Sequence, residues 1–141
     1  MATAKITAQW IEGGLFAGKD SRGAAIVMGT SEEHQPTWLG VKSSELLLLS
    51  IAGCSGHDVA EILQKQRQPI ASLEIHVTGE QDNDPPWKFG KIEIEYVIRG
   101  RGVNEAFVQR AIDLSENKYC SVLATVRPGC AITTHYRIED A

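Results

Sequence analysis

Two cysteines of this chain stand in surroundings that suit thiol chemistry. Cys54 lies inside a long apolar segment, and Cys120 lies in a polar segment far downstream. Plotted as a helix, at about 100° per residue, the first segment puts Cys54 on a polar stripe. That stripe also holds Ser50, His57, Asp58 and Glu61, while the apolar side holds Leu48, Leu49, Ile51, Ala52, Val59, Ile62 and Leu63. Because a structural cysteine packs like a small apolar residue, this placement favours a reactive thiol.

Other interpretations of the same residues stay open. Cys54 also fits a close helix contact beside Gly53 and Gly56, where it would be a packed small side chain. His57 is more typical of a helix surface or an ordinary hydrogen bond than of a catalytic base. We interpret Cys130 as structural, because it has no acidic or basic neighbour to activate it.

Length and composition predict one domain that spans residues 1–141. The chain has 141 residues, 43% of them hydrophobic, which suffices for one core but is small for two. A net charge of −4 and scattered Lys and Arg residues argue against nucleic acid as a partner.

Three cysteines are too few for a disulfide scaffold, and a reducing compartment would keep them as thiols. The N-terminus lacks an apolar signal core and the run Leu46–Ala52 is too short to span a bilayer, so we expect a cytoplasmic protein without a membrane partner.

The spacing of apolar residues around Cys54 predicts a helix from about Ser44 to Gln68. Ser43 or Ser44 can cap this helix, Glu45 complements the positive end of its dipole, and Pro69 stops it. In the first half of the helix, apolar side chains surround the axis. We therefore expect a partner subunit to help to cover it.

Alternating apolar residues predict strands on both sides of that helix. Three short strands before residue 29 form an antiparallel meander, and residues 29–42 interrupt the periodicity. Residues 73–77, 92–98 and 132–138 alternate as later strands, a second helix follows its cap Asn104, and residues 120–126 fit either a short helix or a strand. The resulting order, β-β-β-α-β-β-α-(α)-β, predicts an α+β fold with mostly antiparallel sheet packed on two main helices.

These motifs resemble the OsmC/Ohr superfamily of thiol-dependent peroxidases, and are most similar to its OsmC-like branch. The resemblance rests on a leucine run that leads into Ala52-Gly53-Cys54, followed by Asp58-Val59, and on Lys118-Tyr119-Cys120 downstream. It runs through most of the chain, and the two spaced cysteine motifs in this element order are fairly specific. The resemblance implies an intertwined homodimer with two long central helices and with active sites at the subunit interface.

By this resemblance, Cys54 is the peroxidatic thiol and Cys120 the resolving thiol. The Cys54 thiolate would attack an organic hydroperoxide, and its sulfenic acid would condense with Cys120 to a disulfide that an external thiol or dithiol reduces, without a cofactor. Hydroperoxide reductases of this superfamily also use an Arg from the N-terminal hairpins and a Glu early in the cysteine helix. The corresponding candidates are Arg22 and Glu45, although Glu45 stands one residue closer to Cys54 than the usual Glu, whose place Ser44 takes.

Two hypotheses of other classes compete with a peroxidase. Cys54 and His57 are one helical turn apart and could bind zinc with Cys120 as a third ligand, although a single Cys-x-x-His is a weak signal. The alternative is a dimer that binds a small ligand and uses its thiols for redox sensing. Glu45 and Arg22 likewise have plain interpretations, as a charge on the helix dipole and as a solvated turn residue.

Overall fold

The computed structural model describes residues 2–30 and 39–141. The described residues form two compact units, Met1–Leu47 and Leu48–Ala141. Of the segment that we expect to interrupt the periodicity, residues 29–42, the stretch 31–38 lies outside the described residues.

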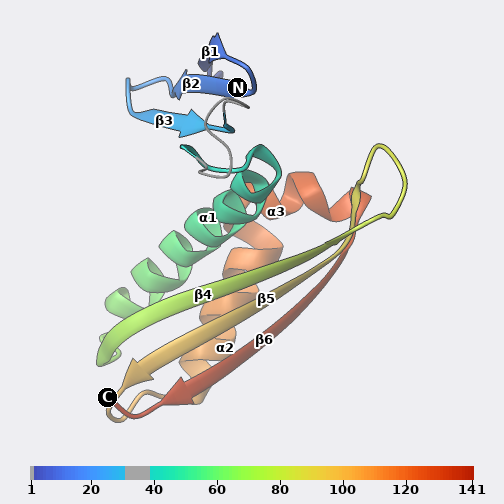
Figure 1. Cartoon of the computed structure of the whole chain (residues 1–141). Helices are drawn as coiled ribbons and strands as arrows, with labels where there is room; N and C mark the ends of the chain where they lie inside the picture. Colours follow the sequence, from blue (N-terminus) through green and yellow to red (C-terminus); the bar gives the residue numbers. More distant parts are fainter. Residues whose placement is uncertain (1, 31–38) are drawn as a thin grey trace. The chain divides into compact units, whose positions relative to one another are not determined.

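The first unit contains the predicted antiparallel meander. Its strands are β1 (Thr7–Glu12), β2 (Leu15–Lys19) and β3 (Ala25–Met28), paired in the order β1-β2-β3 (Figure 1). The side chain of Asp20 shapes the turn between β2 and β3, because its Oδ1 accepts hydrogen bonds from the backbone N–H groups of Arg22 at 2.8 Å and Ala24 at 2.9 Å. Arg22 is therefore a turn residue, and it is exposed.

The central helix α1 runs from Ser43 to Lys65, three residues shorter than predicted at its C-terminal end. Its last turn closes in a Schellman motif before Pro69 is reached. The N–H of Gln68 donates to the carbonyl of Leu63 and the N–H of Arg67 to that of Gln64, both at 2.9 Å. Arg67 takes the left-handed conformation with φ 56°, a place where glycine is more common.

The fully buried stripe of α1 is narrower than the predicted apolar side and includes one polar residue. The stripe follows i, i+4 spacing and consists of Ile51, Ser55, Val59 and Leu63. Leu49, expected inside, is 55% exposed, and the polar Ser55 is fully buried. The exposure of Leu49 fits the expectation that a partner subunit covers the first half of the helix, whereas hydropathy alone cannot anticipate that the buried hydroxyl of Ser55 finds hydrogen-bond partners in the fold. Cys54 borders this stripe and packs against the core.

Gly56 sets how closely α1 approaches the second sheet. A Cβ atom added at Gly56 would lie 2.6 Å from Cδ1 of Ile75, whereas one at Gly53 would meet nothing within 4 Å. By length and mean hydropathy (1.4), α1 could cross a membrane, but the core helix of a globular protein passes the same test. Here the helix packs its buried stripe into the core of the second unit.

The second sheet consists of β4 (Ile70–Gln81), β5 (Phe89–Gly100) and β6 (Ala131–Glu139). The pair β4–β5 is antiparallel, as are both pairs of the first sheet, but β5–β6 is parallel. Figure 1 shows α1 and α2 (Glu105–Leu114) covering one face of this sheet. Alternate residues of the central strand β5 form the floor of the core: Ile92, Ile94, Tyr96 and Ile98.

The chain between α2 and β6 is helical. A π-helix, η2 (Ser115–Tyr119), continues α2, and α3 (Ser121–Val126) and the 3₁₀ turn η3 (Arg127–Gly129) follow. The segment that fitted either a helix or a strand is therefore a helix. Asn104 caps α2 as predicted, its side chain accepting from the N–H of Ala106 at 2.9 Å. The predicted element order and α+β class are confirmed.

Candidate active site

The structure brings Cys54 and Cys120 together within the second unit. Cys54 projects from the middle of α1, and Cys120 is the residue directly before α3. Their side chains are hydrogen-bonded to each other. Both cysteines are free thiols, Cys120 buried at 3% exposure and Cys54 half-buried. The two residues that the sequence pairs across 66 positions are thus neighbours in space.

Local hydrogen bonds favour the thiolate form of Cys54. Burial opposes the charge, but the backbone N–H of Val122 and the side chains of Cys120 and Ser121 donate to the sulfur and together lower the pKa of Cys54. Asp58 opposes this effect through its negative charge. Since the thiolate is the nucleophile, the arrangement increases the reactive fraction of Cys54 at neutral pH.

The environment of Cys120 has the opposite effect. Burial and the adjacent Cys54 raise the pKa of Cys120 to about 11, although the N–H of Leu123 donates to its sulfur at 3.4 Å. Cys120 is therefore a protonated thiol that can donate a hydrogen bond to its neighbour. Before oxidation, the pair therefore consists of one thiolate, which can attack a peroxide, and one protonated thiol.

A set of buried and half-buried polar side chains connects α1, β5 and η2 near the two thiols in sequence. Ser55 is hydrogen-bonded to Tyr96 of β5, and the Tyr96 hydroxyl donates to Oε2 of Glu116 in η2 at 2.9 Å. Ser115 of η2 donates to Oδ2 of Asp58 in α1 at 2.8 Å. Sequence reasoning missed this set, because Tyr96 alternates with isoleucines and was interpreted as core, and Ser55 carries no signal of its own.

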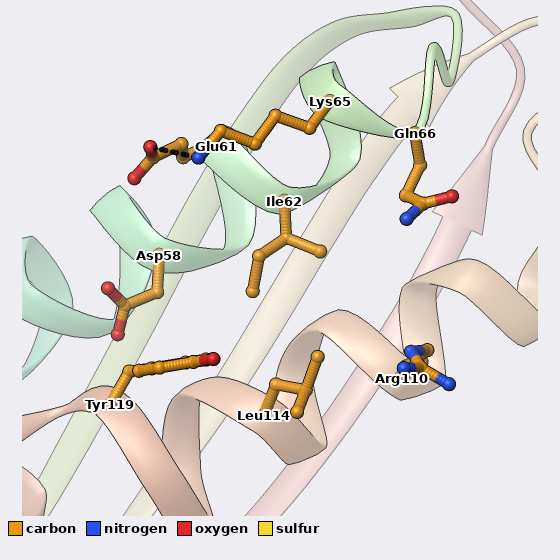
Figure 2. Close-up of a pocket in the computed structure, with 8 residues that line it drawn as sticks. All are labelled: Asp58, Glu61, Ile62, Lys65, Gln66, Arg110, Leu114 and Tyr119. Atoms are coloured by element: carbon orange, nitrogen blue, oxygen red, sulfur yellow. Dashed lines mark ion pairs between the residues drawn. The ribbon is translucent and has the colours of Figure 1, made fainter.

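A pocket of about 550 Å³ is lined by residues of α1, α2 and η2, among them Asp58 and Tyr119. Figure 2 shows it between the C-terminal half of α1 and α2–η2, with Asp58 pointing toward Tyr119 and Ile62 toward Leu114. Its rim is charged: Glu61 and Lys65, paired at 2.7 Å, and Arg110. Asp58, which acts on the charge of Cys54, lines this pocket, but neither Cys54 nor Cys120 does.

Comparison with known proteins decides the family. The family model of OsmC-like proteins matches residues 34–135, most of the chain. The chain belongs to the OsmC-like family. The superfamily resemblance inferred from the two cysteine motifs is therefore confirmed.

Relatives of this OsmC-like chain extend over nearly its whole length. Protein YhfA of Escherichia coli strain K12 is 36% identical over 134 residues, which cover 94% of this chain and 96% of YhfA. A hypothetical protein from Aquifex aeolicus VF5 is 33% identical, with a TM-score of 0.88, and the match covers 100% of this chain and 99% of that one. The organic hydroperoxide resistance protein OhrB of Bacillus subtilis shares the fold at 18% identity and a TM-score of 0.62, covering 96% and 98% of the two chains.

The remaining candidate residues of this OsmC-like chain lie away from the thiol pair or in the other unit. Arg22 and Glu45 belong to the first unit, so their catalytic roles stay predictions. Cys130 stands before β6, where its sulfur donates to the carbonyl of Val126 at 3.5 Å, which agrees with a structural interpretation.

The zinc hypothesis finds no support in the geometry. The side chain of His57 is 76% exposed and lies 3.6 Å from Glu61. Within residues 2–30 and 39–141, no group of three or more His, Cys, Asp and Glu side chains is arranged to hold a metal ion. The contacts of Cys54 are instead those expected of a reactive thiolate.

Proposed function

We propose that this protein is a thiol-dependent peroxidase that reduces organic hydroperoxides. One observation carries the proposal: a thiolate-favouring Cys54 is hydrogen-bonded to a second, protonated cysteine. Membership of the OsmC-like family, some of whose structural relatives are named organic hydroperoxide resistance proteins, supports the substrate class.

The proposed cycle needs only the two thiols and an external reductant. The Cys54 thiolate attacks the terminal oxygen of the hydroperoxide, the O–O bond breaks, and the alkoxide leaves as an alcohol after taking a proton. The Cys54 sulfenic acid then reacts with Cys120, forming an S–S bond and releasing water. An external dithiol or two thiols reduce the disulfide and are themselves oxidised.

The proposal includes a homodimer in a reducing, cytoplasmic setting, with the whole chain acting as one domain. Exposed apolar side chains on the first half of α1, Leu47 at 39% and Leu49 at 55%, are consistent with cover from a second copy. We further propose that Arg22 and Glu45 assist at the peroxide, as the family resemblance implies, with Arg22 able to stabilise negative charge on the oxygens.

The decisive experiment is peptide mapping under non-reducing conditions. Fully reduced protein is mixed with one equivalent of cumene hydroperoxide and then quenched at increasing times with an alkylating agent. We expect a rapid disulfide between Cys54 and Cys120, with Cys130 alkylated throughout as an internal control.

A second assay, with excess peroxide and an added dithiol, separates the proposal from its competitor. In this assay the loss of peroxide is monitored over time. A peroxidase consumes many equivalents of peroxide at the expense of the dithiol, whereas a protein that only senses oxidation does not. If Cys54 stays reduced while the peroxide persists, the proposed function is wrong.

A further inference from the structure

The segment that carries Cys120 has an unusual backbone. The π-helix η2 (Ser115–Tyr119) has wide turns, and the N–H of Cys120 donates to the carbonyl of Ser115 at 2.8 Å. Such turns are rare and interrupt the regular helical ladder. The position of Cys120 therefore depends on whatever holds this one wide turn in place.

Glu116 ties the turn to the sheet. Its carboxylate accepts from the Tyr96 hydroxyl at 2.9 Å and from Oγ1 of Thr134 at 2.7 Å, which come from the neighbouring strands β5 and β6. Its backbone carbonyl accepts from the Arg127 guanidinium at 3.0 Å. The residue four positions before Cys120 is thus fixed through both its side chain and its backbone.

Ser115 ties the same turn to α1. Its hydroxyl is fully buried and lies 2.8 Å from Oδ2 of Asp58 and 3.1 Å from Oγ of Ser55. Ser55 directly follows Cys54, and Asp58 lies one helical turn further on. These hydrogen bonds therefore connect the turn that precedes Cys120 to the residue that follows Cys54 and to Asp58.

The proton directions in this set are mutually consistent. Each hydroxyl has one proton to donate. Tyr96 and Thr134 can donate to Glu116, Ser55 can donate to the oxygen of Tyr96, and Ser115 can donate to Asp58. Each chain of donations then ends on the carboxylate of Glu116 or Asp58, and no buried side-chain nitrogen or oxygen in the described part of the chain lacks a partner.

We propose that Glu116, held by Tyr96 and Thr134, is a positioning residue that keeps Cys120 in place to resolve the oxidised Cys54. This inference rests on the proposed peroxidase function. It assigns Glu116 no contact with the peroxide. Its effect is on the second chemical step, because a displacement of about 1 Å at a reacting group can slow a reaction about 100-fold.

Two fates compete for the Cys54 sulfenic acid. Attack by the Cys120 sulfur forms the disulfide and releases water, which preserves the enzyme. Attack of the sulfenate on a second hydroperoxide transfers another oxygen, gives sulfinic acid and an alcohol, and is not reversed by thiols. The fraction of sulfinic acid formed at a fixed peroxide concentration measures how well Cys120 is placed.

Tyr96→Phe and Thr134→Val are the test variants, and Tyr136→Phe is the matched control. Tyr136 stands opposite Tyr96 in the β5–β6 register, but its hydroxyl contacts Glu105 at 2.7 Å and Gln109 at 2.6 Å on α2 rather than η2. Each protein, reduced and checked for thermal unfolding, receives a series of cumene hydroperoxide concentrations in the presence of a dithiol. Intact mass then gives the disulfide and sulfinic fractions, and stopped flow gives the rate of the first oxidation.

We expect each test variant to raise the ratio of sulfinic acid to disulfide by about tenfold, the effect of one lost buried hydrogen bond, with the first oxidation rate unchanged. Tyr136→Phe should match the wild type. An unchanged ratio in both test variants, or an equal rise in Tyr136→Phe, would overturn the role of Glu116 while leaving the peroxidase proposal intact. Failure of wild-type Cys54 to oxidise at all would overturn both, and it is seen before any variant is made.

Discussion

The two compact units of this chain differ in how far their apolar side chains are buried. In the second unit, buried side chains from α1, β5, α2 and α3 form one cluster. In the described part of the first unit, Leu15 is the one buried apolar side chain, while Trp10 (62%) and Phe16 (39%) are exposed. The second unit thus encloses a hydrophobic core of its own, whereas the first unit leaves large apolar side chains exposed.

The chemistry follows the same division. The thiol pair and the polar set that connects α1, β5 and η2 lie wholly in the second unit. Arg22 and Glu45, which only the family resemblance nominates, lie in the first. Under the function proposed above, the thiol reaction therefore belongs to the second unit, and the roles proposed for the first unit in assembly and at the peroxide can be tested separately. Three experiments test this division.

The largest effect is expected from Cys54→Ser. Removing the nucleophile should lower hydroperoxide consumption by about 1,000-fold or more, because neighbouring groups cannot replace the attacking sulfur. Cys130→Ser is the matched control, since Cys130 belongs to the same unit and its hydrogen bond to Val126 can be kept by a hydroxyl. A coupled peroxide assay measures both. Equal losses in the two variants would show that the thiol pair is not the centre of the activity.

The next effect concerns the exposed surface of the first unit. Phe16 lies directly opposite Trp10 on one side and Met28 on the other, so the three side chains form one row on the same face of the sheet. If a second copy covers this row, Phe16→Ser should weaken the dimer by about 2 kcal/mol, or about 30-fold in Kd, without unfolding the chain.

Sedimentation over a range of concentrations checks this expectation. Trp87→Ser is a suitable control, because Trp87 is a similarly exposed aromatic residue (55%) of the second unit. Dissociation by Trp87→Ser alone would assign the interface to the second unit and reverse the comparison. A monomeric wild type would show that the apolar row serves something other than self-association.

The sequence predicted the regular elements of both units, but not the features that depend on contacts between distant segments. Alternation and helical periodicity predicted the order of the elements, because both units are built from regular amphipathic segments. The parallel pairing of β5 and β6 and the π-helix before Cys120 carry no local signal, since both depend on contacts between segments distant in sequence. Tyr96 shows the limit clearly: its alternation predicts a core position, which it occupies, but not the carboxylate of Glu116 that its hydroxyl meets.

For the candidate site, the sequence predicted the two cysteines but not the groups around them. Sequence motifs nominated Cys54 and Cys120, which are neighbours in the structure, but a polar stripe on α1 was a poor guide to their surroundings. His57 and Glu61 of that stripe are exposed, and Asp58 opposes the thiolate, whereas the groups that lower the pKa of Cys54 are Cys120 and the first residues of α3. A backbone N–H such as that of Val122 leaves no trace in residue type, so no pattern could have revealed it.

The smallest effect is expected from Ser121→Ala. This variant tests which groups within the second unit lower the pKa of Cys54. The Ser121 side chain helps to lower the pKa of Cys54. Its contribution is smaller than those of the backbone N–H of Val122 and the thiol of Cys120. Because Ser121 is exposed, its contribution is small: its loss should raise the pKa of Cys54 and lower the thiolate fraction at neutral pH by no more than about threefold.

The rate of iodoacetamide alkylation at Cys54, measured against pH, reports this change directly. A raised pKa shifts the whole profile to higher pH, since alkylation requires the thiolate. Thr125→Ala is the control, because the Thr125 hydroxyl donates within the same helix, to the carbonyl of Ser121 at 2.8 Å, and not to Cys54. If both variants shift the profile equally, the stability of α3 as a whole, rather than the Ser121 hydroxyl, tunes the nucleophile. If neither shifts it, the Val122 backbone and Cys120 are sufficient, and the reactivity of Cys54 depends on the placement of α3 alone.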